Sequence, residues 1–339
     1  MDVRTKIPLK NYTTMALGGD ARFMAPVSTV AEVMQIYQNA AAQQLPIFIL
    51  GGGSNVIARD EGFDGIVLLN RIPGFEVISD DTTTAVIKIG AGELWDDVVK
   101  RTVQMGLSGI EAMSAIPGTA GAAPVQNVGA YGQEIADTLI SLEAYDSQTG
   151  RVVTLQAADC QFSYRHSIFR GREQGRYCIL NITIRLSHTA PQPPFYAAVT
   201  RYFDEHHITT FTPQAIRDAV IAIRADKLPD PAKRPNTGSF FKNALVDEWR
   251  LAELEKEYAQ VPHYQMPHNK FKIPTGWLIE KAGLKGRLLY GMRVHDKNAL
   301  VLINESASSY HDLAKARHEI IQTVYDTFHI QIEQEPLEI

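Results

Sequence analysis

Two short segments built almost entirely from small residues limit what this chain can fold into. The first, Gly51-Gly-Gly-Ser-Asn55, directly follows the apolar run 47–50. Consecutive glycines permit positive φ and let backbone N–H groups approach a pyrophosphate, so a glycine loop after a buried strand indicates a nucleotide site. The dinucleotide fingerprint is incomplete, however, because Val56 stands where its last glycine belongs and no Walker lysine follows. A tight turn without a ligand remains an alternative.

The second segment, 115–132, reads AIPGTAGAAPVQNVGAYG. It has too few large side chains to bury apolar area of its own, and its bare backbone permits close approach of a large flat or phosphorylated ligand. A structural Gly/Ala loop would look similar. Two such segments in the first half of one chain together favour a bound nucleotide.

The hydrophobic pattern predicts a mixture of helices and strands. Val30, Val33, Met34 and Tyr37 repeat with helical spacing, whereas the predicted strands are short runs of β-branched and aromatic residues between turn residues. We expect helices over 29–44, 93–105, 213–225, 246–258 and 310–328. We expect strands over 47–50, 65–70, 85–90, 139–145, 151–155, 177–186, 299–304 and 330–335. The segment 187–194 has three prolines in four positions, which oppose helix and central strand, so a domain boundary is expected near it.

Composition excludes several classes of protein. With 339 residues, the chain is long enough for two or three packed units. Its 33 Lys and Arg against 38 Asp and Glu leave a net charge of -5, which argues against binding the phosphate backbone of a nucleic acid. Cys160 and Cys178 are too few for a zinc site or a disulfide scaffold, so we expect buried thiols and no metal. Neither a signal peptide nor a membrane-spanning run is visible, which indicates a cytoplasmic protein.

Several isolated polar residues have both a functional and an ordinary explanation. Arg165 lies among aromatic and hydroxyl neighbours, where a guanidinium can hold a carboxylate, but surface arginines are common. Arg224 and Lys227 fall near the end of a predicted helix, where the helix dipole alone favours positive charge. Ser239 can donate a proton, yet it lacks the Gly-x-Ser-x-Gly turn of a serine nucleophile. Glu335 is by default a solvated carboxylate near the C-terminus.

Taken in order along the chain, these segments resemble the UDP-N-acetylenolpyruvoylglucosamine reductase family. The resemblance runs from about Asn11 to Glu335, and the order of the segments carries it more than any one motif. The matching pieces are 11–14, 51–55, 116–121, 124–132, 164–167, 227–231, 238–243, 282–286, 295–304 and 332–335. The chain departs from the family pattern at Ala122-Ala123, which replaces a Ser/Gly pair, and at Leu337, where many members have an arginine.

The resemblance implies a mixed α+β and α/β fold, with an FAD-binding domain of the vanillyl-alcohol-oxidase (PCMH) type and a C-terminal α+β substrate-binding domain. The expected division is a first FAD-binding subdomain over 1–70, joined by a C-terminal strand at 329–339, a second over 71–190, and a substrate-binding domain over 205–328. The implied activity is NADPH-dependent reduction of UDP-N-acetylglucosamine enolpyruvate to UDP-N-acetylmuramate through bound FAD, in peptidoglycan precursor synthesis. We therefore expect FAD and NADPH as cofactors, and a monomer that binds neither nucleic acid nor membrane.

The resemblance also assigns roles residue by residue. Arg165 and Glu335 would flank the enolpyruvyl carboxylate, and Ser239 would be the proton donor. Tyr196 would cover the substrate. The substrate diphosphate would be held by Lys227, Asn243 and Asn298. FAD would be held by Gly51, Gly53, Ser54, Asn55, Ile116, Pro117, Gly118, Ala122, Gln126, Gly129, Tyr131, Gly132 and Arg224.

Two other functions stay open at this point. A flavin oxidase of the same fold would oxidise an alcohol and pass the electrons to oxygen. A nucleotide-sugar-binding protein without catalysis would be colourless when purified. Anaerobic addition of NADPH and then of the enolpyruvyl nucleotide separates the reductase from the oxidase, and the yellow colour of bound flavin excludes the binding protein.

Overall fold

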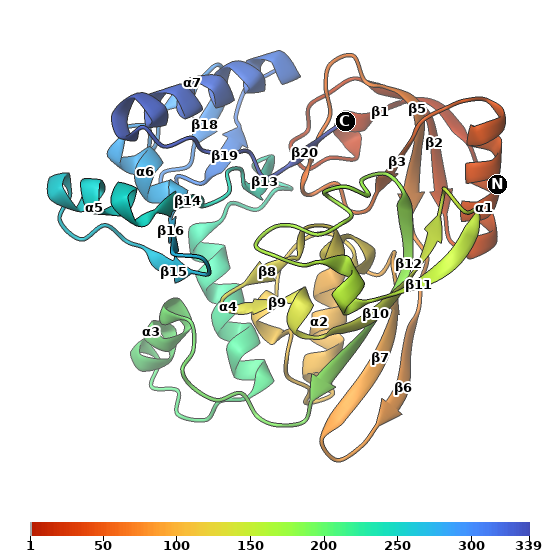
Figure 1. Cartoon of the computed structure of the whole chain (residues 1–339), viewed down its shortest axis with the longest axis horizontal. Helices are drawn as coiled ribbons and strands as arrows, with labels where there is room; N and C mark the ends of the chain where they lie inside the picture. Colours follow the sequence, from red (N-terminus) through yellow and green to blue (C-terminus); the bar gives the residue numbers. More distant parts are fainter. Residues whose placement is uncertain (1) are drawn as a thin grey trace. The chain divides into compact units, whose positions relative to one another are not determined.

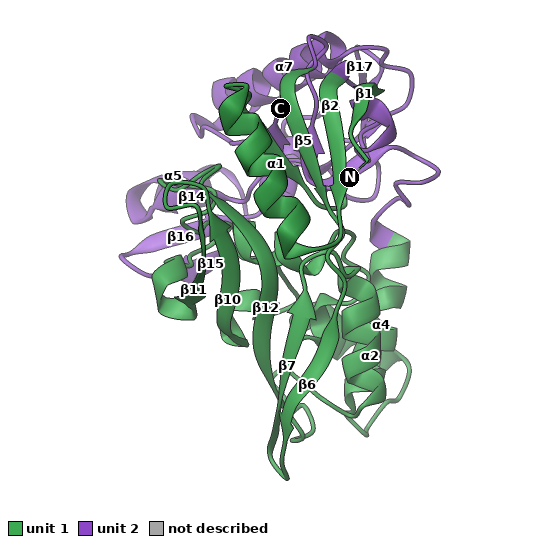
Figure 2. Cartoon of the chain, turned by 90° about the vertical axis from the view of Figure 1, so that its right-hand side faces the viewer, with its two compact units in different colours: residues 1–7, 21–53, 63–226 green, residues 8–20, 54–62, 227–339 purple. Residues whose placement is uncertain are grey.

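The computed structural model describes residues 2–339, which divide into two compact units. Unit 1 comprises the described residues up to 7 together with 21–53 and 63–226, and unit 2 comprises 8–20, 54–62 and 227–339 (Figure 2). Each unit is therefore assembled from segments that are distant in the sequence. The proline segment 187–194 lies within unit 1. The expected division at 1–70, 71–190 and 205–328 stays a prediction.

The first sheet of unit 1 has the strand order β1-β2-β5-β3 (Figure 1). Its elements, with the helix that packs on it, are β1 (Arg4–Pro8), β2 (Asp20–Val27), α1 (Val30–Ala42), β3 (Ile47–Leu50) and β5 (Phe63–Asn70). β5 pairs in parallel with both β2 and β3. Parallel strands are usually covered on both faces, which explains the unbroken buried run at the end of β5. α1 begins at a capping box formed by Thr29 and Glu32, and it buries Val33 and Ile36 against the sheet.

The second sheet of unit 1 is antiparallel, with the order β11-β10-β12-β7-β6. Its strands are β6 (Phe75–Asp80), β7 (Thr84–Gly90), β10 (Leu139–Asp146), β11 (Arg151–Gln156) and β12 (Tyr177–Ser187). Burial alternates along β7, as expected for a strand with one face on a core. Ile87 and Ile182 from that face share a core with Val99 of helix α2 (Trp95–Gln104).

Two further helices of unit 1, α3 (Ala197–Glu205) and α4 (Pro213–Lys227), follow the proline segment. Val199 and Phe203 of α3 pack with Ile216 and Val220 of α4 in a small separate core. The short elements of unit 1 are η2 (Glu111–Met113), η3 (Ala120–Gln126), β8 (Gly129–Ala130), β9 (Gln133–Glu134), η4 (Ile135–Asp137) and η5 (Ala157–Cys160).

Unit 2 is built from small sheets and helices around its own core. One sheet has the order β13-β19-β18-β17, another has the order β14-β16-β15, and β20 pairs in parallel with β4. The elements are η1 (Leu9–Asn11), β4 (Val56–Ile57), β13 (Asn236–Ser239), β14 (Ala244–Asp247), α5 (Glu248–Glu257), β15 (Tyr264–Met266), β16 (Lys270–Ile273), α6 (Thr275–Lys281), β17 (Leu288–Leu289), β18 (Met292–Val294), β19 (Val301–Asn304), α7 (Tyr310–Phe328) and β20 (Leu337–Glu338). Phe240 and Phe241 are buried in this core with Leu313 and Ile320 of α7.

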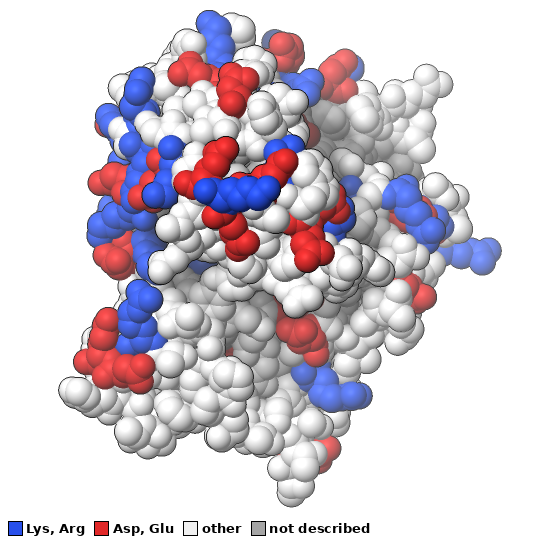
Figure 3. All heavy atoms as spheres, turned by 60° about the vertical axis from the view of Figure 1, so that its left-hand side comes forward, with Lys and Arg blue, Asp and Glu red and all other residues white. Residues whose placement is uncertain are grey.

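The charge distribution on the surface and the state of the two cysteines agree with the expectations from the composition. Acidic and basic side chains are interspersed on the face shown in Figure 3, in line with the net charge of -5. Cys160 and Cys178 are buried and not disulfide-bonded, as expected, and burial raises the pKa of each thiol to about 12. Within 2–339, no helix combines the length and the apolar character that crossing a membrane requires.

The predicted helices are confirmed, with ends displaced by at most two residues. The predicted strand over 330–335 is wrong. Those residues are irregular apart from an isolated bridge between Phe241 and Gln334, and the last strand comes only at Leu337–Glu338. Ile330 and Ile332 are nevertheless buried. The alternation therefore reflects burial of side chains in the core of unit 2, whereas the backbone lacks a strand beside it along most of this segment.

An ion-pair cluster fastens β20 inside unit 2. The Glu338 carboxylate accepts a hydrogen bond from Arg59 Nη2 at 2.7 Å and another from Arg317. Burial alone raises the pKa of Glu338, but the hydrogen bonds from Arg59, Arg317 and Tyr310 outweigh it and hold that pKa at about 2.

Replacement of Glu338 by glutamine should therefore destabilise the protein in a pH-dependent way. The folded-state pKa lies below the unfolded value of about 4.3, so the ionised carboxylate contributes stability above about pH 4.5 that is lost as the pH falls toward 2. Allowing for the solvent around Arg59, we expect Glu338→Gln to lower the free energy of unfolding by about 1–2 kcal/mol at pH 7. Urea denaturation of both proteins between pH 7 and 3.5 measures the difference, which should shrink with falling pH. A constant difference would contradict the ion-pair account.

Candidate functional site

The glycine loop after β3 meets the second small-residue segment at backbone distance. A Cβ atom added to Gly52 would lie 2.7 Å from Gly118 Cα, and one added to Gly51 would lie 2.5 Å from Thr119 Oγ1. Gly53 has φ +66, a conformation that glycine adopts without strain. The structure thus brings together Gly51, Gly53 and Gly118, three of the predicted FAD residues, within unit 1. Here the glycines serve a close approach of two backbones, which a tight turn alone does not require.

The loop 115–132 is fastened along the segment that leads into α2. Trp95 N–H donates to Gly118 O at 3.1 Å, and Ala120 N–H donates to Glu93 O at 2.8 Å. A Cβ on Gly121 would lie 2.5 Å from Ala91 Cβ, so this glycine serves packing. Ile116 packs against the core that contains Val99 of α2. The structural explanation therefore applies to Gly121, whereas the ligand explanation of the other small residues in this loop stays a prediction.

Arg165 lies against the end of this loop. Its Nη2 donates to Gly129 O at 2.9 Å, and its guanidinium lies 5.4 Å from the centre of the Tyr164 ring. Arg165 itself has φ +54, and the neighbouring Ser163 and His166 form an isolated bridge that makes a tight turn. Of the predicted FAD residues, Gln126 accepts a hydrogen bond from Arg170 Nη1 at 2.8 Å. The predicted Arg165, Gln126 and Gly129 thus belong to one connected region of unit 1.

Ser239 and Glu335 are brought together in unit 2, although 95 residues separate them in the sequence. Glu335 N–H donates to Phe240 O at 2.8 Å, and Lys242 N–H donates to Glu333 O at 2.9 Å. The residue that follows Ser239 is therefore paired with Glu335. Glu335 is only 7% exposed. The default prediction from the sequence, a solvated carboxylate near the C-terminus, is therefore wrong.

Asn243 and Asn298 lie beside the first turn of α6, in unit 2. Asn243 Oδ1 accepts a hydrogen bond from Thr275 N–H at 3.1 Å, and Asn298 Oδ1 accepts one from Leu300 N–H at 3.2 Å. A Cβ on Gly276, the second residue of α6, would lie 3.7 Å from Asn298 Oδ1. Lys227 is the exposed last residue of α4. Ser54 and Asn55 belong to unit 2, where Leu337 N–H donates to Asn55 O at 3.0 Å.

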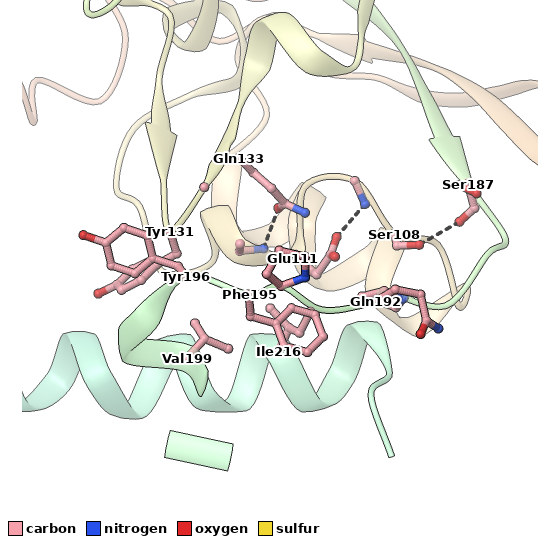
Figure 4. Close-up of a pocket in the computed structure, with 15 residues that line it drawn as sticks. Ser108, Glu111, Tyr131, Gln133, Ser187, Gln192, Phe195, Tyr196, Val199 and Ile216 are labelled. Carbon is pink, nitrogen blue, oxygen red and sulfur yellow. Dashed lines mark hydrogen bonds between the residues drawn. The ribbon is translucent and has the colours of Figure 1, made fainter. Parts of the chain in front are cut away.

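Tyr196 and Tyr131 share the wall of a pocket in unit 1. Their rings meet edge to face with centroids 5.6 Å apart. The pocket has a volume of about 370 Å³, and Gly132 also lines it. In Figure 4 the two tyrosines lie at one end, with Phe195 and Ile216 beside the buried Glu111 in the middle. The predicted substrate-covering tyrosine thus contacts a residue of the predicted FAD loop.

Arg224 adds positive charge to this region. Burial lowers the pKa of Arg224, while the nearby Tyr131 and Asp96 raise it. Burial also raises the pKa of Tyr131, against the opposing effect of Arg224, so the Tyr131 hydroxyl stays protonated at neutral pH.

Sequence reasoning missed Asp96, Ser114 and Arg217. Arg217 is 7% exposed and contacts the other two side chains, which come from segments about 100 residues away. An aspartate in the first turn of a helix is normally explained by the helix dipole, so no local signal distinguishes Asp96.

Two family models match the chain. A model described as an FAD binding domain matches residues 21–156, and a model of the C-terminal domain of UDP-N-acetylenolpyruvoylglucosamine reductase matches residues 230–339. The first match includes both small-residue loops, and the second includes Ser239 and Glu335. The expected fold class, an FAD-binding domain followed by a distinct C-terminal domain, is confirmed.

Known proteins resemble the chain along its whole length. A UDP-N-acetylenolpyruvoylglucosamine reductase from Ralstonia nicotianae is 41% identical over 335 residues, which are 98% of this chain and 98% of that protein. One from Burkholderia ambifaria is 40% identical over 333 residues, 97% of this chain and 95% of that protein. The crystal structure of a UDP-N-acetylenolpyruvylglucosamine reductase from Thermus caldophilus shares the fold, with a TM-score of 0.66 at 23% identity, and the match covers 100% of this chain and 99% of that one. Identity at this level along nearly the full length of both sequences places the chain in the UDP-N-acetylenolpyruvoylglucosamine reductase family.

Proposed function

We propose that this protein reduces UDP-N-acetylglucosamine enolpyruvate to UDP-N-acetylmuramate with FAD and NADPH, in peptidoglycan precursor synthesis. Family membership supports the reaction, and the match to an FAD binding domain supports the cofactor. The observation that carries the proposal is the backbone pairing of Phe240 with Glu335, which places a serine hydroxyl and a buried carboxyl on adjacent segments. The two free thiols suit a reducing compartment, so we propose that the reaction takes place in the cytoplasm. We also propose that the enzyme is a monomer.

The small-residue loops fit the requirements of FAD. Where Gly52 meets Gly118, no Cβ stands between the two backbones, and such bare backbone lets N–H groups reach a diphosphate. The guanidinium of Arg224 adds a charge that suits the same anionic group. When bound, FAD would serve as the carrier that accepts a hydride from NADPH and passes it to the substrate. The residues that we propose to hold it are Gly51, Gly53, Ser54, Asn55, Ile116, Pro117, Gly118, Ala122, Gln126, Gly129, Tyr131, Gly132 and Arg224.

Four residues are proposed to bind the substrate. Each Oδ1 of Asn243 and Asn298 accepts a backbone N–H, which fixes the amide so that its Nδ2 side is oriented as a donor, the kind of group that phosphate oxygens accept. The ammonium of Lys227 provides a flexible point charge for the same diphosphate. Tyr196 is proposed to cover the substrate, and its 43% exposed side chain is accessible for that contact.

The chemistry divides between a proton donor and groups that stabilise negative charge. Reduction adds a hydride to the methylene carbon of the enol ether and a proton to the carbon that bears the carboxylate. We assign that proton to Ser239 Oγ, because a serine hydroxyl, although a weak acid, can protonate a carbanion in a site that excludes water. Arg165 is proposed to hold the substrate carboxylate through its guanidinium. Together with Arg165, Glu335 is proposed to stabilise the charged intermediate, with its carboxyl group protonated or hydrogen-bonded, because an ionised carboxylate would repel the developing charge.

The activity is tested by anaerobic stopped-flow spectroscopy of the FAD-loaded protein. NADPH should bleach the flavin absorption, and the enolpyruvyl nucleotide added next should restore it without oxygen. Restoration only after admission of oxygen would indicate an oxidase. Protein that is colourless and does not take up FAD would indicate a binding protein without redox chemistry. Either of these results would refute the proposed function.

Replacement of Ser239 by alanine should separate the two half-reactions. The hydroxyl acts only when the substrate is protonated, so the half-reaction with NADPH should keep its rate within about twofold. The half-reaction with the enolpyruvyl nucleotide should slow by a factor of about 10²–10⁴, the usual contribution of a positioned acid. Single-turnover stopped-flow measurements give both rates from the same preparation. Equal slowing of both half-reactions would show that Ser239 is not the proton donor.

Replacement of Gly52 by alanine should weaken FAD binding. The new Cβ would lie 2.7 Å from Gly118 Cα, so the two loops must separate. We expect the Kd for FAD to rise about tenfold or more, which corresponds to about 1.4 kcal/mol. Gly175→Ala is the control, because its added methyl group meets open space at φ +79 and strains the backbone away from both loops. Flavin fluorescence on dilution of the FAD-loaded proteins measures the Kd, and equal values for the two variants would refute the close-approach argument.

A further inference from the structure

A partly buried ion pair joins the proposed FAD loop to α4. Arg217 Nη1 donates to Asp96 Oδ1 at 2.6 Å, and Nη2 donates to Asp96 Oδ2 at 2.9 Å, which is a two-pronged contact. Arg217 lies on α4, and Asp96 is the second residue of α2. Arg217 Nη1 also donates to Ser114 Oγ at 3.0 Å, and Ser114 Oγ donates to Glu111 O at 2.6 Å. One guanidinium therefore connects two helices and the residue that precedes the loop.

The same carboxylate holds the loop's first residue in a strained conformation. Asp96 Oδ1 accepts a hydrogen bond from Ala115 N–H at 2.6 Å. Ala115 has φ +57, in the left-handed region that residues with a Cβ rarely adopt. Such a conformation persists only where the surroundings fix it. Three residues later, Gly118 O accepts from Trp95 N–H at 3.1 Å, so the start of α2 sets both ends of the segment 115–118.

The ion pair also sets the position of Arg224. Arg217 and Arg224 are seven residues apart on α4, which is about two helical turns, so they lie on the same face about 10 Å apart along the axis. Contact with Asp96 at two atoms fixes the rotation of α4 and thus the direction of Arg224. Burial raises the pKa of Asp96, but the hydrogen bonds from Arg217 and Ala115 and the charges of Arg217 and Arg224 outweigh it and lower that pKa. The carboxylate is therefore ionised at neutral pH.

We infer that Asp96 and Arg217 are positioning residues, which set the conformation of the 115–118 loop and of Arg224 for FAD. The inference rests on the proposed function, since it assumes that these groups hold FAD. Neither side chain is assigned a contact with the cofactor. Groups that orient a ligand-binding residue from behind typically change affinity 10- to 100-fold when removed, as the partners of metal ligands do.

Asp96→Ala removes both the charge and the acceptor for Ala115 N–H. We expect the Kd for FAD, measured by flavin fluorescence on dilution of the FAD-loaded protein, to rise about 10- to 100-fold. Asp146→Ala is the matched control. Asp146 makes the same two-pronged contact in unit 1, with Arg176 Nε and Nη2 both at 2.8 Å, and it is 2% exposed. Both variants should lower the melting temperature, whereas only Asp96→Ala should change the Kd.

A rescue variant separates positioning from general loss of stability. Glycine adopts positive φ without strain, so adding Ala115→Gly to Asp96→Ala should recover a large part of the FAD affinity. Arg217→Lys keeps the charge but loses the two-pronged geometry, and it should raise the Kd by about tenfold even if Asp96→Ala fails to fold. Equal Kd values for Asp96→Ala and Asp146→Ala, or an unchanged Kd in Arg217→Lys, would overturn the inference while wild-type protein still binds FAD and turns over. Failure of wild-type protein to bind FAD would instead refute the proposed function.

Discussion

The close contact between the backbones at Gly52 and Gly118 is the constraint on which the proposed FAD site depends. A single Cβ at Gly52 would lie 2.7 Å from Gly118 Cα, so the two loops can approach only because neither has a side chain there. Glycine loses more conformational freedom on folding than any other residue, which makes such loops costly to order. The surrounding structure offsets this cost by fastening each loop from behind. Arg71 Nη1 donates to Gly51 O at 3.0 Å, and Trp95 N–H donates to Gly118 O at 3.1 Å.

The sequence predicts those parts of the structure that depend on local pattern. The helix over 310–328 has both predicted ends correct, because Leu313, Ala316, Ile320 and Val324 form one buried stripe and Ser309 caps the start. The predicted strand over 330–335 is wrong because a strand depends on more than local pattern. Its alternating residues are buried, but a strand also needs a partner backbone, and the only pairing present joins this segment to 240–242. Short strands such as β17 and β18 carry too few residues for any period to show.

In the candidate site, too, the sequence predicts what depends on local pattern and misses what depends on long-range contacts. The glycine loop can be recognised from the sequence, because consecutive glycines after an apolar run indicate a place where the backbone must be closely approached. The roles proposed for Ser239 and Glu335 rest on the family resemblance, and their adjacency depends on a pairing across 95 residues that no local pattern encodes. Asp96 and Arg217 gave no signal at all, since each is ordinary for its position on a helix and only the fold places them at 2.6 Å.

The charge of Arg224 is set against the ion pair of Arg217 and Asp96 in unit 1. Arg217 and Arg224 each carry a positive charge, Asp96 carries one negative charge, and burial raises the pKa of Tyr131 so that its hydroxyl stays neutral. Burial of a guanidinium is unfavourable unless an opposite charge compensates it, and it lowers the pKa of Arg224 here. Asp96 compensates Arg217 at two atoms, so its charge cannot serve Arg224 equally well. An anionic ligand beside Arg224 would add a second compensating charge, and the diphosphate of FAD has the required sign.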